Sequence, residues 1–580
     1  MTAGQLVVDA LEAEGVGTVF GLPGGHVLSI YDALHASDSI EHVLVRHEHT
    51  AACMAAAYAQ LTGEPGVCLV TAGPGATNLV TGIAEAYVGC LPIVVLSGRG
   101  ATENARRGAS QEVSTELVFA PITKHSLRVD RADLVADAVA TAFRIARGGK
   151  PGPVLLDLPR DILDAVTMKR PYLPSGRLPR PAGDPELVEA AAAALAAAER
   201  PILIAGGGAI AAAAAPQIVS LAEGLAAPVL TSLAGRGAIA DDHPLSAGGL
   251  GAHRNRESKR LLETADVVIG IGTRFEEMET NWRPGYVPAA DATYVQIDID
   301  PAEIGRGVPA QIGIVGDAGA VVEQLTEALG ARAALLAPDA FREQPRTLAT
   351  AAAVAEIRDE AAAIAATEQS PMHPLTAIAA VRRALPRDGI VAIDVGVLAQ
   401  HMAGASPYFE VFEPRTLIVP SSFYGMGFAA AGLPAAKLVH PDRPAVGFVG
   451  DGSFQMSWSV LPAAAERRLG VTWCILDDNA LGSIYDIQHH RFEDRVLGTE
   501  FELQPDFAAV ARACGCHGER IVDPTGVDAA IGRALEANAE GIPAVLDFAV
   551  ARERLLGTLE HYTFYPEEMV ERARRSLTAA

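Results

Sequence analysis

Three stretches of the chain alternate short runs of β-branched and other apolar residues with longer alanine-rich windows. The short runs have the length and composition of buried strands, and the alanine-rich windows have the length of helices. This alternation is typical of β-α-β units, in which crossover helices join parallel strands and cover both faces of the sheet. It therefore predicts an α/β fold with doubly wound parallel sheets.

Proline-rich joints divide the three stretches. One joint reads "RPYLPSGRLPRPAGDPE" at 170–186, and the other reads "LLAPDAFREQPR" at 335–346. A chain of 580 residues is too long for a single hydrophobic core. We therefore expect three domains and a tail, at residues 1–170, 186–335, 370–550 and 551–580.

The composition limits the partners that the chain can bind. Its formal net charge of −24 would be repelled by nucleic acids and by anionic membranes. No apolar run approaches the ~18–20 residues that span a bilayer, and the N-terminus lacks the basic start of a signal peptide. We therefore expect a cytoplasmic protein that binds small molecules.

Two acidic turns follow apolar runs in the third stretch. The run "AVGFVGDGS" ends in Gly450-Asp451-Gly452-Ser453, and "VTWCILDDN" ends in Asp477-Asp478-Asn479. A glycine-rich turn after a strand offers amides to a phosphate, and a nearby carboxylate can bind a hard cation on that phosphate. Asp-Gly is also common in ordinary tight turns. The second acidic turn favours a metal-diphosphate site.

A polar cluster, Arg46-His47-Glu48-His49-Thr50, lies where a strand of the first stretch runs into an alanine-rich helix. Glu48 has a plain interpretation there, because an acid at a helix N-terminus is favoured by the helix dipole. It also has a functional interpretation, which depends on the rest of the sequence.

Taken together, these motifs resemble the thiamine diphosphate enzymes of the acetolactate synthase-like superfamily. The resemblance covers nearly all of residues 1–550. It includes "VFGLPGG" at 19–25, "RHEHTAA" at 46–52, "AGPGATN" at 72–78, "PITKHS" at 121–126, "GRGAIADDHPLS" at 235–246, "QIDIDPAEIG" at 296–305 and "GMGFAAAG" at 425–432.

The resemblance implies roles for residues around a bound thiamine diphosphate. In this family the glutamate at the position of Glu48 contacts N1′ of the aminopyrimidine ring and so activates the cofactor. Met426 would hold the cofactor in its bent shape. The Mg²⁺ ligands would be Asp451, Asp478 and the carbonyl of Ala480, and the diphosphate would meet the backbone amides of Gly452, Ser453, Gly396 and Val397.

One ligand position stays open. The family has asparagine where this chain has Asp478, so Asn479 would supply the second ligand if the turn shifts by one residue. Since Glu48 and Asp451 belong to different stretches, which the family joins across a subunit interface, the resemblance also implies at least a homodimer, and usually a homotetramer.

The middle stretch resembles the nucleotide-binding domain that holds FAD in acetolactate synthases and ADP in related CoA-dependent enzymes. Its "PILIAGGGAI" contains Gly206, Gly207 and Gly208, which either approach a phosphate or simply pack closely. Gly207 and Arg274 would meet the phosphates, and Asp298 and Asp317 would accept hydrogen bonds from ribose or adenine.

The expected reaction is the cleavage of a short 2-hydroxyacyl-CoA. The chain has Ile487 and Ser110 where acetolactate synthases usually have Trp and Phe. It also has a basic cluster, "HRNRESKR" at 253–260, and a tail that could close as a lid. These features favour a likeness to the 2-hydroxyacyl-CoA lyases, especially the actinobacterial type that releases a ketone and formyl-CoA from 2-hydroxyisobutyryl-CoA, with ADP in the central domain.

In that reading, further residues act on the substrate. Glu493 would exchange a proton with the 2-hydroxyl group, and Gln111 would assist it. Ser110, Leu127 and Phe492 would line a pocket for a short chain. The alternative is an acetolactate synthase-type carboligase or decarboxylase of 2-keto acids that contains FAD.

Overall fold

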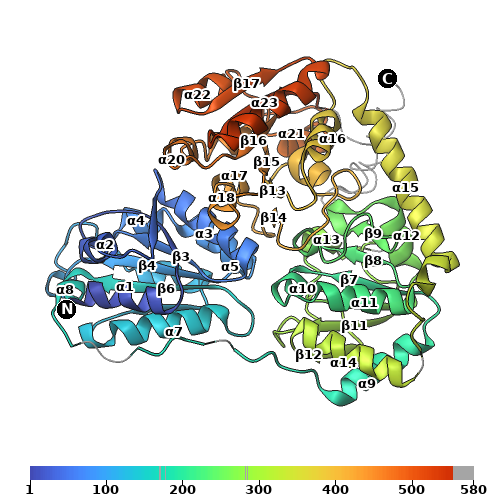
Figure 1. Cartoon of the computed structure of the whole chain (residues 1–580), viewed down its shortest axis with the longest axis horizontal. Coiled ribbons are helices and arrows are strands. Elements are labelled where there is room, and N and C mark those ends of the chain that lie inside the picture. Colours follow the sequence, from blue (N-terminus) through green and yellow to red (C-terminus); the bar gives the residue numbers. More distant parts are fainter. Residues whose placement is uncertain (169–171, 177, 281, 284, 333, 553–580) are drawn as a thin grey trace.

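A computed structural model describes residues 1–168, 172–176, 178–280, 282–283, 285–332 and 334–552. Its strands form three six-stranded sheets in which all neighbouring strands are parallel. Figure 1 shows three domains at the corners of a triangle, the first in blue, the central one in green and the third in orange and red. The expected fold class is confirmed. The tail expected at 551–580 lies, from residue 553 on, outside the described residues.

The first domain has the strand order β2-β1-β3-β4-β6-β5. Its strands are β1 (Thr18–Leu22), β2 (Glu41–Leu44), β3 (Gly66–Val70), β4 (Ile93–Arg99), β5 (His125–Arg128) and β6 (Pro153–Pro159). Its helices are α1 (Ala3–Ala13), α2 (Leu28–His35), α3 (Glu48–Thr62), α4 (Pro74–Thr77), α5 (Val80–Val88), α6 (Thr115–Phe119), α7 (Val135–Arg147) and α8 (Arg160–Asp164).

The third domain repeats this topology strand for strand, in the order β14-β13-β15-β16-β18-β17. Its strands are β13 (Ile390–Ile393), β14 (Leu417–Ile418), β15 (Ala445–Gly450), β16 (Thr472–Asp477), β17 (His517–Ile521) and β18 (Ala544–Ala549). Its helices are α16 (Pro374–Ala384), α17 (Phe428–Gly432), α18 (Ala435–Val439), α19 (Asp451–Gln455), α20 (Val460–Glu466), α21 (Gly482–Arg491), α22 (Phe507–Ala513) and α23 (Val527–Ala539).

The central domain differs, with the order β9-β8-β7-β10-β11-β12, which is the 3-2-1-4-5-6 order of dinucleotide-binding folds. Its strands are β7 (Pro201–Ala205), β8 (Val229–Thr231), β9 (Ser246–Gly249), β10 (Val267–Ile271), β11 (Thr293–Asp298) and β12 (Ile312–Val315). Its helices are α9 (Pro185–Ala197), α10 (Gly207–Ala211), α11 (Ala215–Leu225), α12 (Arg256–Thr264), α13 (Glu277–Thr280) and α14 (Ala318–Ala331), and α15 (Pro345–Ala365) leads to the third domain (Figure 1).

Each sheet has one point where the strand order reverses, between β1 and β3, between β7 and β10, and between β13 and β15. Open α/β sheets bind ligands beside the carboxyl ends of the strands at such a point. The loops that follow these strands are therefore the places to look for a site.

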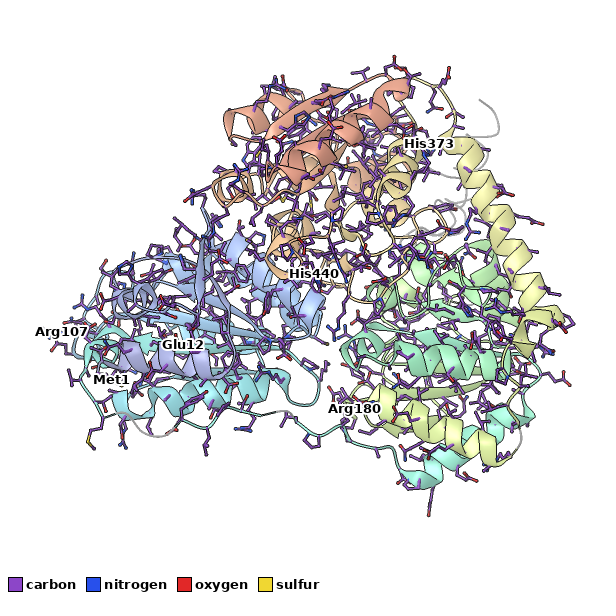
Figure 2. All side chains as sticks on the ribbon, in the orientation of Figure 1. Met1, Glu12, Arg107, Arg180, His373 and His440 are labelled. Carbon is purple, nitrogen blue, oxygen red and sulfur yellow. The ribbon has the colours of Figure 1, made fainter. Side chains whose placement is uncertain are left out.

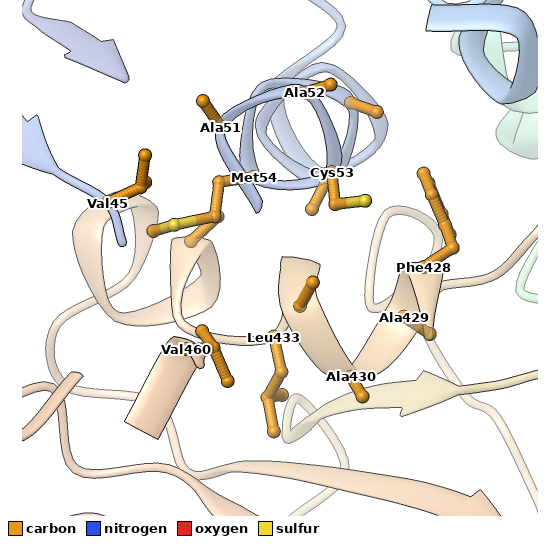
Figure 3. Close-up of a cluster of buried hydrophobic side chains, with 14 of the residues drawn as sticks. Val45, Ala51, Ala52, Cys53, Met54, Phe428, Ala429, Ala430, Leu433 and Val460 are labelled. Carbon is orange, nitrogen blue, oxygen red and sulfur yellow. The ribbon is translucent and has the colours of Figure 1, made fainter. Parts of the chain in front are cut away.

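The first and third domains share one hydrophobic core. Helix α3 packs against α17 and α18, and Figure 3 shows Met54 and Cys53 of α3 facing Leu433 and Phe428. Small residues allow this close approach, since a Cβ on Gly432 would lie only 3.1 Å from the Cβ of Ala57. The alanine-rich composition of α3 thus serves both helix formation and domain packing. Every helix in the described part of the chain is too short or too polar to cross a bilayer.

Candidate active site

Glu48 begins α3 at the carboxyl edge of the first sheet. The residue that caps the helix is His47, whose Nδ1 accepts a hydrogen bond from the His49 amide at 3.2 Å. The Glu48 side chain is only 6% exposed and accepts a hydrogen bond from Nδ2 of Asn78 at 2.8 Å. His47 is therefore the cap, and Glu48 lies in the first turn, where the helix dipole favours an acid, with its side chain held by Asn78.

The loops after β1 and β3 surround this carboxylate. A Cβ on Gly75 would lie 3.5 Å from Oε1 of Glu48, and a Cβ on Gly24 would lie 2.5 Å from the Cβ of Thr71. Nδ1 of His26 lies 3.3 Å from the hydroxyl of Thr71. These loops meet at the reversal point of the sheet, and the loop after β3 supplies Asn78, the hydrogen-bond partner of Glu48.

Gln111 belongs to this edge, but the other expected pocket residues are more scattered. Gln111 is exposed, has a φ of +61° and hydrogen-bonds to His26, and Ser110 lies exposed beside it. Leu127 lies on the edge strand β5, which β4 and β6 separate from β3, and packs half-buried against the core of the first domain.

The turn after β15 forms a second polar centre. Asp451 is 1% exposed, and its Oδ2 accepts a hydrogen bond from Nε2 of Gln504 at 2.6 Å. The same nitrogen donates to Oδ1 of Asp477 at 2.7 Å. Burial, followed by the charges of Asp478 and Asp477, raises the pKa of Asp451 to about 8. The turn therefore concentrates negative charge at one buried point.

Asp477 and Asp478 have different surroundings. Burial opposes the ionisation of Asp477, but a hydrogen bond from Arg520 at 2.8 Å keeps its pKa below the usual value. Asp478 is 8% exposed and is the charged neighbour that raises the pKa of Asp451 most. Ala480, 3% exposed, forms a β-bridge with Glu500. The Arg520 side chain thus pairs with Asp477, whereas the charge of Asp478 acts on Asp451.

The side chain of Asn479 is engaged elsewhere. Its Nδ2 donates to the carbonyl of Phe501 at 3.0 Å, and its φ of +58° places it in the left-handed region that asparagine tolerates. Arg552 donates to the carbonyl oxygens of both Asp478 and Asn479, at 3.0 and 3.2 Å. These contacts fix the turn and hold the Asn479 amide against the 501 backbone.

The loop after β13 faces the same turn. Gly396 has a φ of +138°, and a Cβ there would meet no atom within 4 Å. The amide of Val397 donates to the Ser483 hydroxyl at 3.1 Å, and the hydroxyl of Ser453 donates to the carbonyl of Val395 at 3.2 Å. The amide of Gly452 donates to Oδ1 of Asp451 at 2.8 Å. The hydroxyl of Ser453 thus joins the loop after β13 to the turn after β15. The amides of Val397 and Gly452 would exchange these internal partners for a ligand.

Met426 lies above this centre. Its Cε would be 3.8 Å from a Cβ on Gly452, and the segment that follows it is held by Asp394 at the end of β13. Asp394 is fully buried and accepts hydrogen bonds from the amides of Gly427 at 2.9 Å and Ala430 at 2.8 Å. Burial raises the pKa of Asp394 to about 6, against the effect of these bonds.

The motifs do not identify Asn78, Asp394 and Gln504 as site residues. Asp394 has a local signal, because "AIDVG" places an acid between a strand and a glycine. Gln504 lies in a loop with no pattern around it, and its role depends on the two carboxylates that it joins.

Glu493 and Phe492 lie on the surface after α21. The side chain of Glu493 is 66% exposed and lies 3.9 Å from Arg495, and Phe492 is 41% exposed. Within the described chain, no hydrogen bond joins Glu48 or Asn78 to Asp451. The two polar centres belong to different domains, and we call them the two half-sites.

A cavity of about 360 Å³ lies where the three domains meet. Gly207, Arg274 and Asp298 line it, as expected for a nucleotide site. Arg274 also reaches the first domain, since its Nη2 donates to the carbonyl of Val88 at 2.9 Å. Asp317 lies outside the cavity lining, where it caps α14 and accepts a hydrogen bond from Arg180 at 2.7 Å. Arg180 is labelled in Figure 2.

The three glycines of the central domain divide between the two interpretations. A Cβ on Gly206 would lie 2.2 Å from the carbonyl oxygen of Gly272, and a Cβ on Gly208 would lie 2.8 Å from the Cα of Gly272. These two glycines are required for packing. Gly207 borders the cavity, and a Cβ there would lie 3.2 Å from the Cβ of Ala234. Gly208 lines the cavity as well, so this glycine both packs closely and borders the space for a ligand.

The basic cluster at 253–260 offers no concentrated positive charge for an acyl-CoA. Arg256 pairs with Glu360 at 2.6 Å, Arg260 pairs with Glu257 at 2.6 Å, and Lys259 lies 3.9 Å from Glu263. Arg254 stacks on the ring of Tyr286 at 3.3 Å. The cluster is a helix face with paired charges, which is the ordinary role of such a sequence.

Family models for thiamine pyrophosphate enzymes match three segments of the chain. The N-terminal TPP binding domain matches residues 1–118, the central domain matches 188–325, and the C-terminal TPP binding domain matches 398–548. The two half-sites described above fall in the two TPP binding domains, and the cavity borders the central one.

Curated relatives cover nearly the whole chain. The acetolactate synthase isozyme 3 large subunit of Escherichia coli K12 is 37% identical over 545 residues, which is 92% of this chain and 92% of that protein. A probable acetolactate synthase large subunit of Methanocaldococcus jannaschii is 34% identical over 562 residues, with 95% and 92% covered. The acetolactate synthase large subunit of Corynebacterium glutamicum is 33% identical over 579 residues, with 95% and 87% covered.

These similarities correct the expected reaction. The relatives are acetolactate synthases, so the expected closeness to 2-hydroxyacyl-CoA lyases, with an acyl-CoA substrate and formyl-CoA as product, is wrong. That expectation rested on the basic cluster and on two positions, Ile487 and Ser110, where the sequence differs from acetolactate synthases. They are local differences within a chain that follows the synthases over nearly its whole length.

Proposed function

Because this chain belongs to the thiamine pyrophosphate enzymes, we propose that it is a carboligase of the acetolactate synthase type. It would remove carbon dioxide from one 2-keto acid and join the remaining fragment to a second 2-keto acid. The observation that carries this proposal is the similarity to acetolactate synthase large subunits over nine-tenths of the chain. The half-sites supply the parts that such a reaction needs.

The turn after β15 fits a magnesium ion and a diphosphate. Oxygen donors suit Mg²⁺. Burial first, and then the charges of Asp478 and Asp477, raise the pKa of Asp451, and a divalent cation would relieve the crowding of these charges. We propose Asp451, Asp478 and the carbonyl of Ala480 as its protein ligands. Asp478 is preferred to Asn479 because the Asn479 amide already donates to Phe501. Backbone amides at Gly396, Val397, Gly452 and Ser453 would hold the diphosphate.

Glu48 fits the aminopyrimidine end of the cofactor. When bound, thiamine diphosphate supplies a carbon nucleophile and a sink for the electrons left after decarboxylation. Glu48 would hold a proton at N1′ of the ring, and Asn78 would fix the carboxylate that does so. Met426 would support the cofactor between its two ends. Ser110 and Gln111, which are exposed at the same edge of the sheet, would border the substrate. The role expected for Glu493 belonged to the lyase reaction and is not retained.

A complete site would require two subunits if the chain follows its family, in which the positions of Glu48 and Asp451 meet across a subunit interface. Exposed apolar side chains lie next to the acidic turn, with Met456 59% and Leu503 87% exposed. Exposed apolar surface of this kind is typical of a subunit interface. We propose a homodimer in which Glu48 of one subunit faces Asp451 of the other, and in which two dimers form a tetramer.

We propose FAD as the occupant of the central cavity. The 3-2-1-4-5-6 strand order suits a dinucleotide, and the cationic side chains that line the cavity suit its phosphates. Gly207, Arg274 and Asp298 would contact it. ADP, which belonged to the lyase reading, is the other outcome of the test, since only FAD makes the purified protein yellow.

The test is to incubate the purified protein with thiamine diphosphate, Mg²⁺, FAD and pyruvate and to measure acetolactate. Glu48→Gln serves as the control, because it keeps the size of the side chain and removes its acid function. We expect acetolactate from the parent protein and none above background from the variant. Carbon dioxide and acetaldehyde without acetolactate would show a decarboxylase and overturn the proposal.

A further inference from the structure

Glu85 is a buried acid of the first domain that the proposed reaction does not use. It lies on α5, and its side chain is 1% exposed. Its carboxylate accepts hydrogen bonds from two main-chain amides of the third domain, those of Ser421 and Gly425, the second at 2.8 Å. Burial raises the pKa of Glu85, and these hydrogen bonds oppose the rise.

Glu85 holds the main chain at Ser421 and Gly425, and Met426 follows directly. On the other side of Met426, Asp394 accepts hydrogen bonds from the amides of Gly427 and Ala430. Two carboxylates from two domains therefore anchor the main chain immediately before and after Met426. A methionine side chain has three rotatable bonds, so its position depends strongly on how firmly its backbone is held.

The backbone of this segment needs external support. Tyr424 has a φ of +56°, which costs a non-glycine residue free energy, and Gly427 has a φ of +82°. The Glu85 carboxylate accepts hydrogen bonds from the amides of both Ser421 and Gly425, so the first domain holds both ends of this turn. Ser422 between them donates to Glu276 of the central domain at 2.6 Å. The turn is thus held by neighbouring domains as well as by its own conformation.

We propose that Glu85 is a positioning residue for the thiamine diphosphate site, which acts from the first domain by fixing the segment Ser421–Gly427 and thereby Met426. This inference rests on the proposed function, because it assumes that Met426 supports the cofactor. It assigns to α5 a role in cofactor binding without any contact between Glu85 and the cofactor. Loss of the carboxylate would therefore weaken cofactor binding through Met426.

The first test compares Glu85→Gln with Glu41→Gln in the full-length protein. Glu41 is a matched control, because it also joins the first and third domains, through Arg467 at 2.7 Å, but lies 52% exposed at the start of β2. The apparent Kd for thiamine diphosphate with Mg²⁺, measured by quenching of intrinsic fluorescence, is expected to rise about tenfold in Glu85→Gln, as for loss of a hydrogen bond to a charged group. It should change less than about twofold in Glu41→Gln.

A double-mutant cycle with Met426→Leu separates positioning from general stability. If Glu85 acts through Met426, Glu85→Gln adds little to the loss of affinity that Met426→Leu causes. Additive losses, or a lower Tm with an unchanged Kd, would overturn the inference.

Glu85→Asp keeps the charge, and its Kd is measured if Glu85→Gln does not fold. It should weaken binding less than Glu85→Ala, and equal losses would also overturn the inference. A parent protein that binds thiamine diphosphate but makes no acetolactate would overturn the proposed function alone.

Discussion

The amide nitrogen Nδ2 of Asn78 lies 2.8 Å from Oε2 of Glu48, at the edge of the first sheet where the strand order reverses. Glu48 is 6% exposed, so this bond orients a carboxylate that water can scarcely reach. The orientation matters because an acid that exchanges a proton with a ring nitrogen must be held at a defined distance and angle.

We predict that Asn78→Ala slows the activation of thiamine diphosphate about tenfold, since a hydrogen bond to a charged group contributes about 1.5–3 kcal/mol. The measurement is the rate of hydrogen exchange at C2 of the bound cofactor, followed by NMR. Thr77→Ala, which removes an exposed hydroxyl from the same short helix, is the control and should leave the rate unchanged. Equal exchange in parent and Asn78→Ala would show that Glu48 needs no such support.

A second prediction concerns the metal ligands. Asp478→Ala should raise the Mg²⁺ concentration needed for half-maximal binding of thiamine diphosphate at least about tenfold, because it removes one of few oxygen ligands. Asn479→Gly removes the neighbouring amide but tolerates the φ of +58°. It should lower the Tm through loss of the bond to Phe501 and change the Mg²⁺ requirement little. The reverse pattern would place Asn479 at the ion.

These two residues also show how far the sequence alone could lead. The strand-turn pattern predicted the three parallel sheets and pointed to the acidic turn at Asp451, because a turn after a buried strand is a local feature. The role of Glu48 came only from the family resemblance. The choice between Asp478 and Asn479 was not local. It depends on the backbone angle at Asn479 and on the carbonyl of Phe501, which lies 22 residues further along the chain.

The roles of Glu85 and Gln504 could not be predicted from the sequence, for a related reason. Each acts on groups that only the folded chain brings near, a main-chain segment of another domain for Glu85 and two carboxylates for Gln504. The reaction could not be deduced from the half-sites either, because Glu48, Met426 and Asp451 would serve the first step of any enzyme with this cofactor. The similarity to acetolactate synthases over nearly the whole chain is what favours one reaction over the other.

The third prediction concerns pH and stability. Asp157 on β6 is fully buried, and burial raises its pKa to about 7, aided by the charge of Glu116 and opposed by Arg99. Since an unfolded aspartate has a pKa of about 3.9, the folded protein binds this proton more tightly than the unfolded chain. The stabilisation from Asp157 is therefore complete below about pH 4 and is lost as the pH rises to about 7.

The cofactor-free protein should accordingly lose Tm between pH 5 and pH 8, and Asp157→Asn should lose less over the same range. Scanning calorimetry at several pH values measures the difference between the two slopes. Asp130→Asn is the control, because Asp130 is 53% exposed in a surface ion pair with Arg128. Parallel curves for the parent and Asp157→Asn would contradict the assignment.

The last prediction tests the shared site. Glu48→Gln and Asp451→Asn should each be inactive, one for want of the acid and the other for want of a metal ligand. If Glu48 of one subunit works with Asp451 of the other, a mixed dimer contains one site with both substitutions and one intact site. Random association of equal amounts, by co-expression or by refolding together, should then restore about a quarter of the parent activity, because half of the dimers are mixed and each has one intact site. If a single chain held both residues of each site, every site in the mixture would carry a substitution, and the mixture would stay as inactive as either variant alone.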